Sequence, residues 1–326
     1  MTAPGGASRP HGALAALVCV QVLFGLHYLA AKVVVAEIPP ASWALMRAGS
    51  AAVLLLLAVA ARGIRLPLSG PSLARFAGLA LIGVALNQWL FVEGISRTTP
   101  AHSALINASI PVLVLLIAVL LRREKLSAGR LAGIATTLCG VLILTGRHTP
   151  GQETGSAIGD LLSLCNAASY SLFLVLGKPV FERERTLPAT TLLMSAGTLW
   201  LLPVGLPGLV HLRAAEIAPA TWGLAAFIVL GPTIGAYVLN TYALRRLESS
   251  LVAFFVYLQP VLGAGLSIAL GLEQPTRRLF VSGAIVFLGI FIALRARPRA
   301  QRGRATPTAP RAFRNRGTSD SGSRGP

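Results

Sequence analysis

Long apolar stretches, separated by short polar connections, recur from near residue 13 to near residue 294. Each is about 16 to 24 residues long, and roughly 20 helical residues span the hydrocarbon core of a bilayer. The stretches lack the alternation of membrane β-strands, so helices are favoured over a barrel. We therefore predict an all-α polytopic membrane protein with ten transmembrane helices. The predicted spans are residues 13–36, 43–61, 74–95, 101–121, 130–146, 159–180, 188–210, 221–243, 250–270 and 279–294.

The second half of the chain repeats the first. Shifting the sequence by about 149 residues superposes Pro111 on Pro260 and Gly140 on Gly289, as well as Arg97 on Arg246 and Glu124 on Glu273. A repeat that contains an odd number of spans places its two copies in opposite orientations, as in alternating-access carriers. The sequence thus predicts two inverted five-helix repeats.

This repeat divides the chain into five predicted parts. The two repeats are flanked by polar segments and joined by a short linker, and there is no room outside the bilayer for a soluble catalytic domain. The parts are a cytoplasmic N-terminal segment (1–12), the first repeat (13–146), an outer linker (147–158), the second repeat (159–294) and a disordered basic cytoplasmic tail (295–326).

Charge predicts the orientation. The chain is 54% apolar and only 12% charged, yet carries a net charge of +18. With a cytoplasmic N-terminus, and with the tail left out, 12 basic residues fall on the inner side and five on the outer side. The positive-inside rule therefore predicts an inner or plasma membrane protein with both termini in the cytoplasm. The hairpin containing Arg122, Arg123 and Lys125 loses its basic residues in the second copy, as an inverted repeat requires.

The tail contains nine arginines and one aspartate among many Pro, Gly and Ser residues. Such a composition cannot bury a core, and its basicity suits the anionic lipids of the inner leaflet. Phe313 stands alone, so no aromatic interleaving favours nucleic-acid binding. We expect contact with the lipid bilayer and no binding of nucleic acid.

The run from Leu105 through Pro111 and Glu124 to Gly133, followed by Gly140-Val-Leu and repeated from Val252 to Gly289, resembles the EamA-type pattern of the drug/metabolite transporter (DMT) superfamily. The resemblance covers about residues 13–294. It implies a ten-helix inner-membrane carrier with a central substrate cavity. Members move amino acids, other metabolites, sugars or drugs, often outward. Phe24 stands where tryptophan is commoner, and Gly283 is shifted against Gly133; neither departure affects the expected fold.

Ionisable groups at membrane depth are costly and are therefore site candidates. Glu93 and His27 are the predicted proton-coupling residues, although a structural role for either stays open. Arg47 could pair with an acidic side chain, such as Glu37 or Glu93, or with a substrate carboxylate. Lys32 and Lys178 lie near span ends, where they could reach the headgroups. His102 begins the fourth span, and we expect it to be hydrated.

Neutral polar residues within the spans are predicted to line the substrate cavity, or alternatively to hold helices together. Pro111 and Pro260 each remove a backbone donor and bend a helix, so they are predicted kinks that could act as gates. The cavity candidates are Asn87, Gln88, Trp89, Asn107, Asn166, Tyr170, Tyr237, Asn240, Tyr257 and Gln259.

These features predict a secondary active transporter of small metabolites, amino acids or drugs that works by alternating access, and we expect it to be an exporter. No Gly-rich phosphate-binding loop is present, so a gradient would supply the energy. No catalytic residue, metal or cofactor is expected, and a homodimer is possible. The alternatives are an intramembrane lipid-modifying enzyme, for which the carboxylates are too few, and a receptor or other non-transporting membrane protein.

Overall fold

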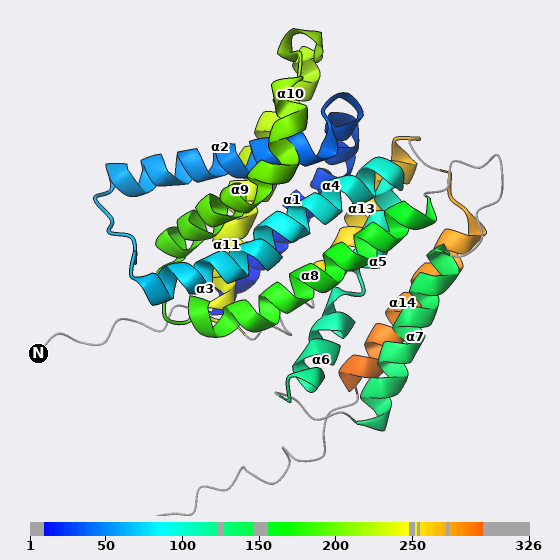
Figure 1. The fold of residues 1–326 in the computed structure, drawn as a ribbon. Helices are drawn as coiled ribbons and strands as arrows, with labels where there is room; N and C mark the ends of the chain where they lie inside the picture. Colours follow the sequence, from blue (N-terminus) through cyan, green and yellow to red (C-terminus); the bar gives the residue numbers. More distant parts are fainter. Residues whose placement is uncertain are drawn as a thin grey trace, which may run out of the picture.

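The computed structural model describes residues 10–122, 127–145, 156–247, 252, 255–271 and 274–295, and all of its regular structure there is helical. The helices follow one another with short connections (Figure 1). In the first half they are α1 (Pro10–Glu37), α2 (Pro40–Ala61), α3 (Gly70–Ala80), η1 (Leu81–Leu86), α4 (Asn87–Arg97), α5 (Pro100–Asn107), α6 (Ile110–Leu120) and α7 (Ala128–Thr145). In the second half they are α8 (Ala157–Phe181), α9 (Thr186–Val210), η2 (Ala214–Glu216), α10 (Pro219–Ile228), η3 (Val229–Gly235), α11 (Ala236–Leu244), η4 (Phe255–Tyr257), α13 (Leu258–Ala269) and α14 (Arg277–Arg295).

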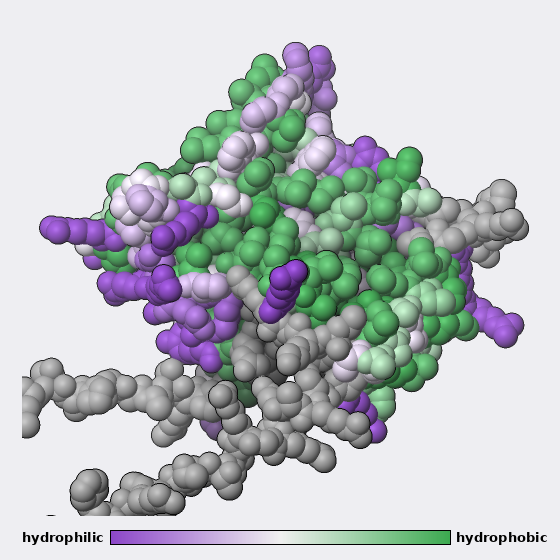
Figure 2. Space-filling model, turned by 60° about the horizontal axis from the view of Figure 1, so that its bottom comes forward, coloured by the Kyte–Doolittle hydropathy of each residue, from purple (hydrophilic) through white to green (hydrophobic). Residues whose placement is uncertain are grey.

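Seven continuous helical stretches of the described residues are long and apolar enough to cross a membrane, and a shorter apolar helix lies at Leu131–Ile143. A broad hydrophobic surface runs across the molecule, with hydrophilic residues gathered toward its margins (Figure 2). The prediction of a helical membrane protein is therefore confirmed. Helix covers all or part of each predicted span, while the ten-span count and the inverted arrangement stay predictions. The seven stretches are 11–37, 40–61, 70–97, 100–120, 157–181, 186–210 and 219–244.

Local chemistry starts two helices that shape the site. Pro100 occupies the first turn of α5, where a backbone donor is not needed, and the side chain of Thr99 accepts a hydrogen bond from the backbone N of His102 at 3.2 Å. At the start of α8 the side chain of Ser156 accepts from the backbone N of Gly159 at 3.0 Å. Because these caps satisfy free donors, both helices begin at fixed points beside each other.

Helix irregularities fall at matching places in the two halves. The π-helical turns η1 and η3 both interrupt a long span and are followed by α4 and α11. Likewise, α5 ends at Asn107 and α6 begins at Ile110, just before Pro111, and the 3₁₀ turn η4 immediately precedes the helix that contains Pro260. Proline removes a hydrogen bond one turn earlier, which accounts for the break before Pro111. The irregular backbone lies at mid-helix, where it can shape a cavity.

Two lysines close helix ends in an equivalent way. Lys32 on α1 donates from Nζ to the carbonyl oxygens of Ile95 (2.9 Å) and Thr98 (2.8 Å) at the end of α4, and Lys178 on α8 donates to Leu244 O (3.0 Å) at the end of α11. Carbonyls in the last helical turn have no partner within the helix. Both ammonium groups therefore cap a neighbouring helix. Their positions near span ends had led us to expect that they would extend to the headgroups.

Helices α7 and α14 lie side by side at one edge of the molecule (Figure 1), where they share an apolar cluster with α5 and α6. Their backbones approach closely at two glycines that the sequence repeat makes equivalent. A Cβ on Gly140 would lie 2.8 Å from Val286 N, and a Cβ on Gly289 would lie 2.8 Å from Gly133 O. Such contacts with backbone atoms cannot be relieved by a side-chain rotation, so each glycine is needed for this packing.

We predict that Gly289→Ala destabilises the protein, because the methyl group would force α7 and α14 apart. Overpacking of this kind costs about 1–3 kcal/mol. Gly283 on the same helix is the matched control: the nearest atom to a Cβ there, on Leu105, is 3.8 Å away. In detergent, the midpoint of thermal unfolding should be lower than in the wild type for Gly289→Ala and should not be lowered for Gly283→Ala. Equal midpoints would contradict the close approach of the two helices.

The basic hairpin at Arg123 and Lys125, the acidic residues Glu124 and Glu273, and the tail lie outside the described residues.

Candidate functional site

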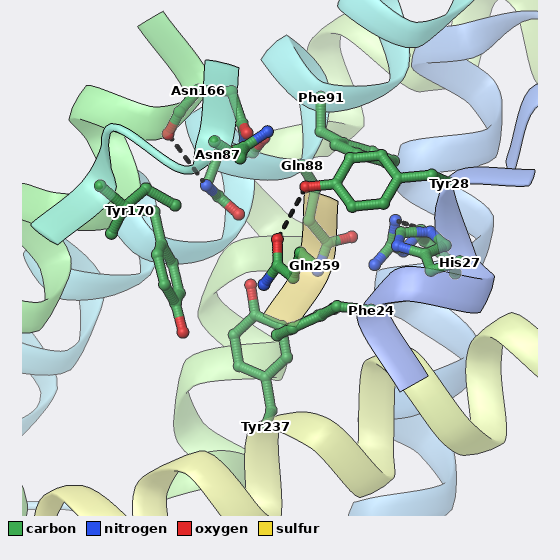
Figure 3. A pocket seen from close by; sticks show the side chains of 13 residues that line it. Phe24, His27, Tyr28, Asn87, Gln88, Phe91, Asn166, Tyr170, Tyr237 and Gln259 are labelled. Atoms are coloured by element: carbon green, nitrogen blue, oxygen red, sulfur yellow. Dashed lines mark hydrogen bonds between the residues drawn. The ribbon is translucent and has the colours of Figure 1, made fainter. Parts of the chain in front are cut away.

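A polar cavity lies between the central parts of the helices. It collects side chains from α1, α2, α4, α5, α6, α8, α11 and α13, several of which carry amide or phenol groups (Figure 3). The space between these side chains, including open solvent at the mouth, amounts to about 500 Å³. The lining residues are Phe24, His27, Tyr28, Arg47, Asn87, Gln88, Phe91, Asn107, Ile110, Asn166, Tyr170, Tyr237 and Gln259.

Arg47 is the cation of this cavity. It is 2% exposed, and its guanidinium donates from Nε to Thr233 Oγ1 at 3.2 Å and lies 3.1 Å from Nε2 of His27 through Nη1. The His27 ring stacks on Phe91 with centroids 4.7 Å apart, which holds the imidazole in place. Within the described part of the chain no carboxylate lies within 4 Å of Arg47. A guanidinium has five N–H donors, so donors remain for a bound group.

The acidic residues considered as partners of Arg47 bond elsewhere. Glu37 accepts from Thr221 Oγ1 (2.7 Å) and from the backbone N of Ala218 (2.8 Å), and the Glu93 carboxylate pairs with Arg97 one turn along α4. Neither of the two predicted acidic partners therefore contacts Arg47, and its pairing with a substrate carboxylate stays a prediction.

A chain of hydrogen bonds joins α1 to α13 across the cavity. Tyr28 donates from its hydroxyl to Gln259 Oε1 at 2.8 Å, and Gln259 donates from Nε2 to Gln21 Oε1 at 2.6 Å (Figure 3). All three side chains are buried. Buried polar groups stabilise a structure only when they find partners, so this chain fixes the orientation of the Gln259 amide at the cavity wall.

Two asparagines join the halves of the molecule. Asn87 Nδ2 donates to Asn166 O at 3.3 Å, and Asn166 Nδ2 donates to Asn87 O at 2.7 Å (Figure 3). One turn further along α8, the Tyr170 hydroxyl accepts a hydrogen bond from Asn240 Nδ2 at 2.9 Å. We predicted that such residues would either line the cavity or hold helices together. Asn87, Asn166 and Tyr170 do both.

Gln88 is the least satisfied polar group at the cavity. Its side chain is 2% exposed, and neither atom of its amide makes a hydrogen bond within the described residues; its near neighbour is the phenol of Tyr237, which itself donates to Gly83 O at 2.8 Å. An unsatisfied buried amide costs about 1–3 kcal/mol. A ligand that supplies both a donor and an acceptor would recover that energy.

The structure places most predicted cavity residues together. Asn87, Gln88, Asn107, Asn166, Tyr170, Tyr237 and Gln259 line the cavity, and His27 joins them. Asn240 lies behind Tyr170, and the side chain of Tyr257 is outside the described residues. Trp89 and Glu93 are not among the lining residues: on a helix they lie about 100° or more from the face that carries Gln88 and Phe91. Trp89 packs against the hydrophobic core.

The expectation for His102 is wrong. Its side chain is 4% exposed and lies 3.2 Å from the carboxylate of Asp160 through Nδ1. The position at the start of a span suggested hydration, but the N-terminal turn of α8 packs over this histidine. Asp160 was not among the predicted site residues, although it is one of only two aspartates in the chain.

Sequence reasoning also missed the apolar and aromatic part of the cavity wall. Phe24 and Tyr28, four residues apart on α1, share a helix face with His27, while Phe91 and Ile110 complete the wall. The spacing of Phe24, His27 and Tyr28 was the available signal. For metals, the described residues contain no group of three or more His, Cys, Asp or Glu side chains.

Known proteins share this sequence pattern and fold. The family model described as "EamA-like transporter family" matches residues 11–146 and 157–295. The uncharacterized transporter YyaM of Bacillus subtilis is 27% identical over 280 residues, which cover 84% of this chain and 90% of that protein. The uncharacterized inner membrane transporter YedA of Escherichia coli is also 27% identical, over 86% of this chain and 90% of its own.

Two further matches bear on function and fold. A probable terminal-alkyne amino-acid exporter of Streptantibioticus cattleyicolor is 27% identical over 294 residues, which cover 90% of this chain and 96% of that protein. A solved structure titled only "Crystal structure of protein" superposes with a TM-score of 0.63 at 21% identity, covering 89% of this chain and 99% of that one. At this identity the structural match shows a shared fold.

Proposed function

The chain belongs to the EamA-like transporter family of the drug/metabolite transporter superfamily, and on that premise we propose that it exports a small carboxylate-bearing metabolite by alternating access. The single observation that carries the substrate class is Arg47: a buried guanidinium in a central cavity, with no carboxylate partner in the described part of the chain. A buried cation without a counter-charge is unfavourable, and a substrate carboxylate would supply one.

The other groups that line the cavity have the chemistry to bind an amino acid. The buried amide of Gln88 and the fixed amide of Gln259 offer carbonyl oxygens to an ammonium group, while Phe24 and Phe91 provide apolar surface for a side chain. The amino-acid exporter among the relatives agrees with this class. In this proposal Arg47 binds the carboxylate and the two glutamines bind the amine.

The proposed mechanism uses two inverted five-helix repeats that rock around this cavity. Support comes from the equivalent positions of η1 and η3, of the breaks near Pro111 and Pro260, and of the caps made by Lys32 and Lys178. Irregular backbone at mid-membrane is tolerated where it lines a cavity. Pro111 and Pro260 would then act as the bending points of the two gates.

The remaining predictions complete the proposal. Both termini would lie in the cytoplasm, with domain limits as predicted, and the basic tail would contact anionic lipid; a homodimer is compatible with it. His27 is the proton-coupling candidate at the cavity because it contacts Arg47, and Glu93 is the candidate outside it. If pH-dependent flux is unchanged in Glu93→Gln, the proton role of Glu93 is excluded.

Counterflow in proteoliposomes tests the proposal. Vesicles loaded with a panel of unlabelled amino acids, including L-propargylglycine as a terminal-alkyne amino acid, are diluted into the same labelled compound. We expect transient accumulation that saturates with concentration and depends on a free carboxylate, so the matching amides should fail. Conductance without counterflow would indicate a channel, and turnover of lipid with no flux would favour the lipid-modifying enzyme; either result would reject the carrier.

A further inference from the structure

A second buried polar cluster lies where the end of α4, the start of α5 and the start of α8 meet. We call it the polar junction; it consists of Thr98, His102, Ser103, Asp160 and Ser163. Asp160 is fully buried and accepts a hydrogen bond from Thr98 Oγ1, while Nδ1 of His102 lies 3.3 Å and 3.2 Å from its two carboxylate oxygens. Next to this pair, Ser163 Oγ donates to Ser103 Oγ at 3.2 Å.

The backbone is built to bring this junction together. The backbone N of Ser156 donates to Arg97 O at 2.9 Å, which ties the start of α8 to the end of α4. A Cβ on Gly159 would lie 2.7 Å from the carbonyl carbon of Arg97 and 2.8 Å from Thr98 N, so only glycine allows this approach. Asp160, the next residue, is thereby pressed against Thr98 in the first turn of α8, where the helix dipole favours a carboxylate.

A polar stripe leads from the junction to the cavity. Along α8, Asp160, Ser163 and Asn166 recur every three residues on one face, and Asn166 lines the cavity. On the facing helix α5, Asn107 donates from Nδ2 to Ser103 O at 2.9 Å and also lines the cavity. Six residues of helix span about 9 Å, so the Asp160 carboxyl lies roughly that far along α8 from the cavity wall.

The fold that the two repeats are predicted to share does not require polar residues at the junction. The repeat offsets of 146 and 149 residues place Leu14, Leu247 and Leu251 at the positions equivalent to Asp160, Thr98 and His102. Thr98 and His102 of the first repeat meet Asp160 of the second, whereas the three equivalent positions, two in the second repeat and one in the first, are all leucine. A buried ionisable pair costs more than leucines of similar size, so its presence at one end only indicates a role beyond packing.

The charged groups around the pair come from several helices. Lys32 on α1 binds Thr98 O at 2.8 Å, Arg97 on α4 pairs with Glu93 at the surface, and Arg278 on α14 donates to Ile143 O at the end of α7. Helix α6 and η1 contribute no ionisable side chain, and Arg75 of α3 and Arg130 of α7 lie near the other ends of their helices. Among the ionisable side chains of the described residues named here, His102 is the one that contacts the Asp160 carboxylate directly.

We propose that Asp160 and His102 form a proton-binding site of the carrier, connected to the substrate cavity through Ser163 and Ser103. This inference rests on the proposed transport function. When the site is empty it holds a carboxylate and a neutral imidazole; one added proton converts it to an imidazolium–carboxylate pair, without any other bond being made or broken. The proton would be exchanged for substrate, because the polar stripe joins the two sites and because export needs a driving ion.

The site can be tested without any substrate. Asp160 and Asp320 are the only aspartates in the chain, so Asp320→Asn leaves one aspartate and keeps the junction intact. Cell-free synthesis with [4-¹³C]aspartate then gives a protein with a single labelled carboxyl, whose ¹³C shift is followed against pH in lipid nanodiscs. We expect a titration step at the midpoint of the His102 imidazole, and its loss in His102→Gln. A ¹³C shift that does not change with pH while the protein stays folded, or that changes equally in His102→Gln, would overturn the proposal.

Transport measurements distinguish a role of the pair in proton coupling from a purely structural role. In proteoliposomes containing L-propargylglycine or another amino acid that the wild type carries, Asp160→Asn and His102→Gln should retain counterflow within about twofold and lose the acceleration by an inward pH gradient. Glu216→Gln, which changes a surface carboxylate paired with Arg213, is the control and should keep that acceleration. Loss of gradient drive in Glu93→Gln alone, or equal loss of counterflow and drive in folded Asp160→Asn, would overturn the proposal. If the wild type shows no counterflow, the transport proposal fails instead, and the ¹³C titration still decides the proton site.

Discussion

Replacing Arg47 by methionine is expected to abolish binding and counterflow of carboxylate substrates. The guanidinium is buried, and it is the only cation lining the cavity within the described residues. Removing one partner of a buried charged pair costs about 2–5 kcal/mol, so substrate affinity should fall by about 30-fold or more. Saturation of counterflow and direct binding to the purified protein measure the loss. Arg47→Lys should recover part of the affinity, because a lysine keeps the charge but not the two-pronged geometry.

Although Arg47→Met should lose substrate affinity, its thermal stability should not fall. Without substrate, Arg47 makes hydrogen bonds only to Thr233 and His27 and has no counter-charge in the described part of the chain. Replacing such a charge by an apolar group of similar length removes a desolvation penalty. Arg47→Met should therefore unfold at the same temperature as the wild type or higher. Arg213→Met, which removes a surface arginine paired with Glu216 at 3.0 Å, is the control and should change neither property. A strongly destabilised Arg47→Met would show that Arg47 is structural.

The helices and the polar character of the cavity could be predicted from the sequence. Hydropathy determines which segments are helical in a membrane, and asparagine or glutamine at mid-span is rare enough to mark a cavity. Asn87, Gln88, Asn107 and Gln259 were predicted in this way and line one space. Their grouping could not be derived from one sequence, because it depends on how each helix is rotated about its axis.

The departures from prediction at Trp89 and His102 have a common physical origin. Trp89 shares a helix with Gln88 but lies on another face, and one sequence gives no reference direction for the cavity. His102 was expected in water because it begins a span, yet its neighbours in space come from α8, 58 residues away along the chain. Asp160 was not considered as a site, because nothing in the sequence indicated that it packs against His102. Long-range packing decided both cases.

The π-helical turns η1 and η3 were also not foreseen. They carry glycines and a single proline in η3, but such residues occur in many regular membrane helices. Their position directly before Asn87 and Tyr237 gives them a role, because an extra residue in a turn rotates the following helix and so directs Asn87 and Tyr237 toward the cavity.

Removing the cap at Lys32 should have the second-largest effect, on stability. The ammonium donates to Ile95 O at 2.9 Å, Ser96 O at 3.3 Å and Thr98 O at 2.8 Å, so Lys32→Met leaves several carbonyl groups at the end of α4 without these donors. Hydrogen bonds from charged donors contribute about 1.5–3 kcal/mol each, and partial replacement by water reduces the sum. We expect a loss of about 2–5 kcal/mol and a lower thermal midpoint in detergent.

The equivalent lysine is the matched control for this prediction. Lys178 donates to one carbonyl, Leu244 O at 3.0 Å, and forms a 2.7 Å ion pair with Glu182, whose side chain is half exposed. Surface ion pairs contribute about 0–1 kcal/mol, so Lys178→Met should be clearly milder than Lys32→Met. Because Thr98 also binds Asp160, Lys32→Met should in addition shift the ¹³C titration of the polar junction, whereas Lys178→Met should leave it unchanged. Equal destabilisation by the two substitutions would mean that the number of capped carbonyls does not set the stability of these helix ends.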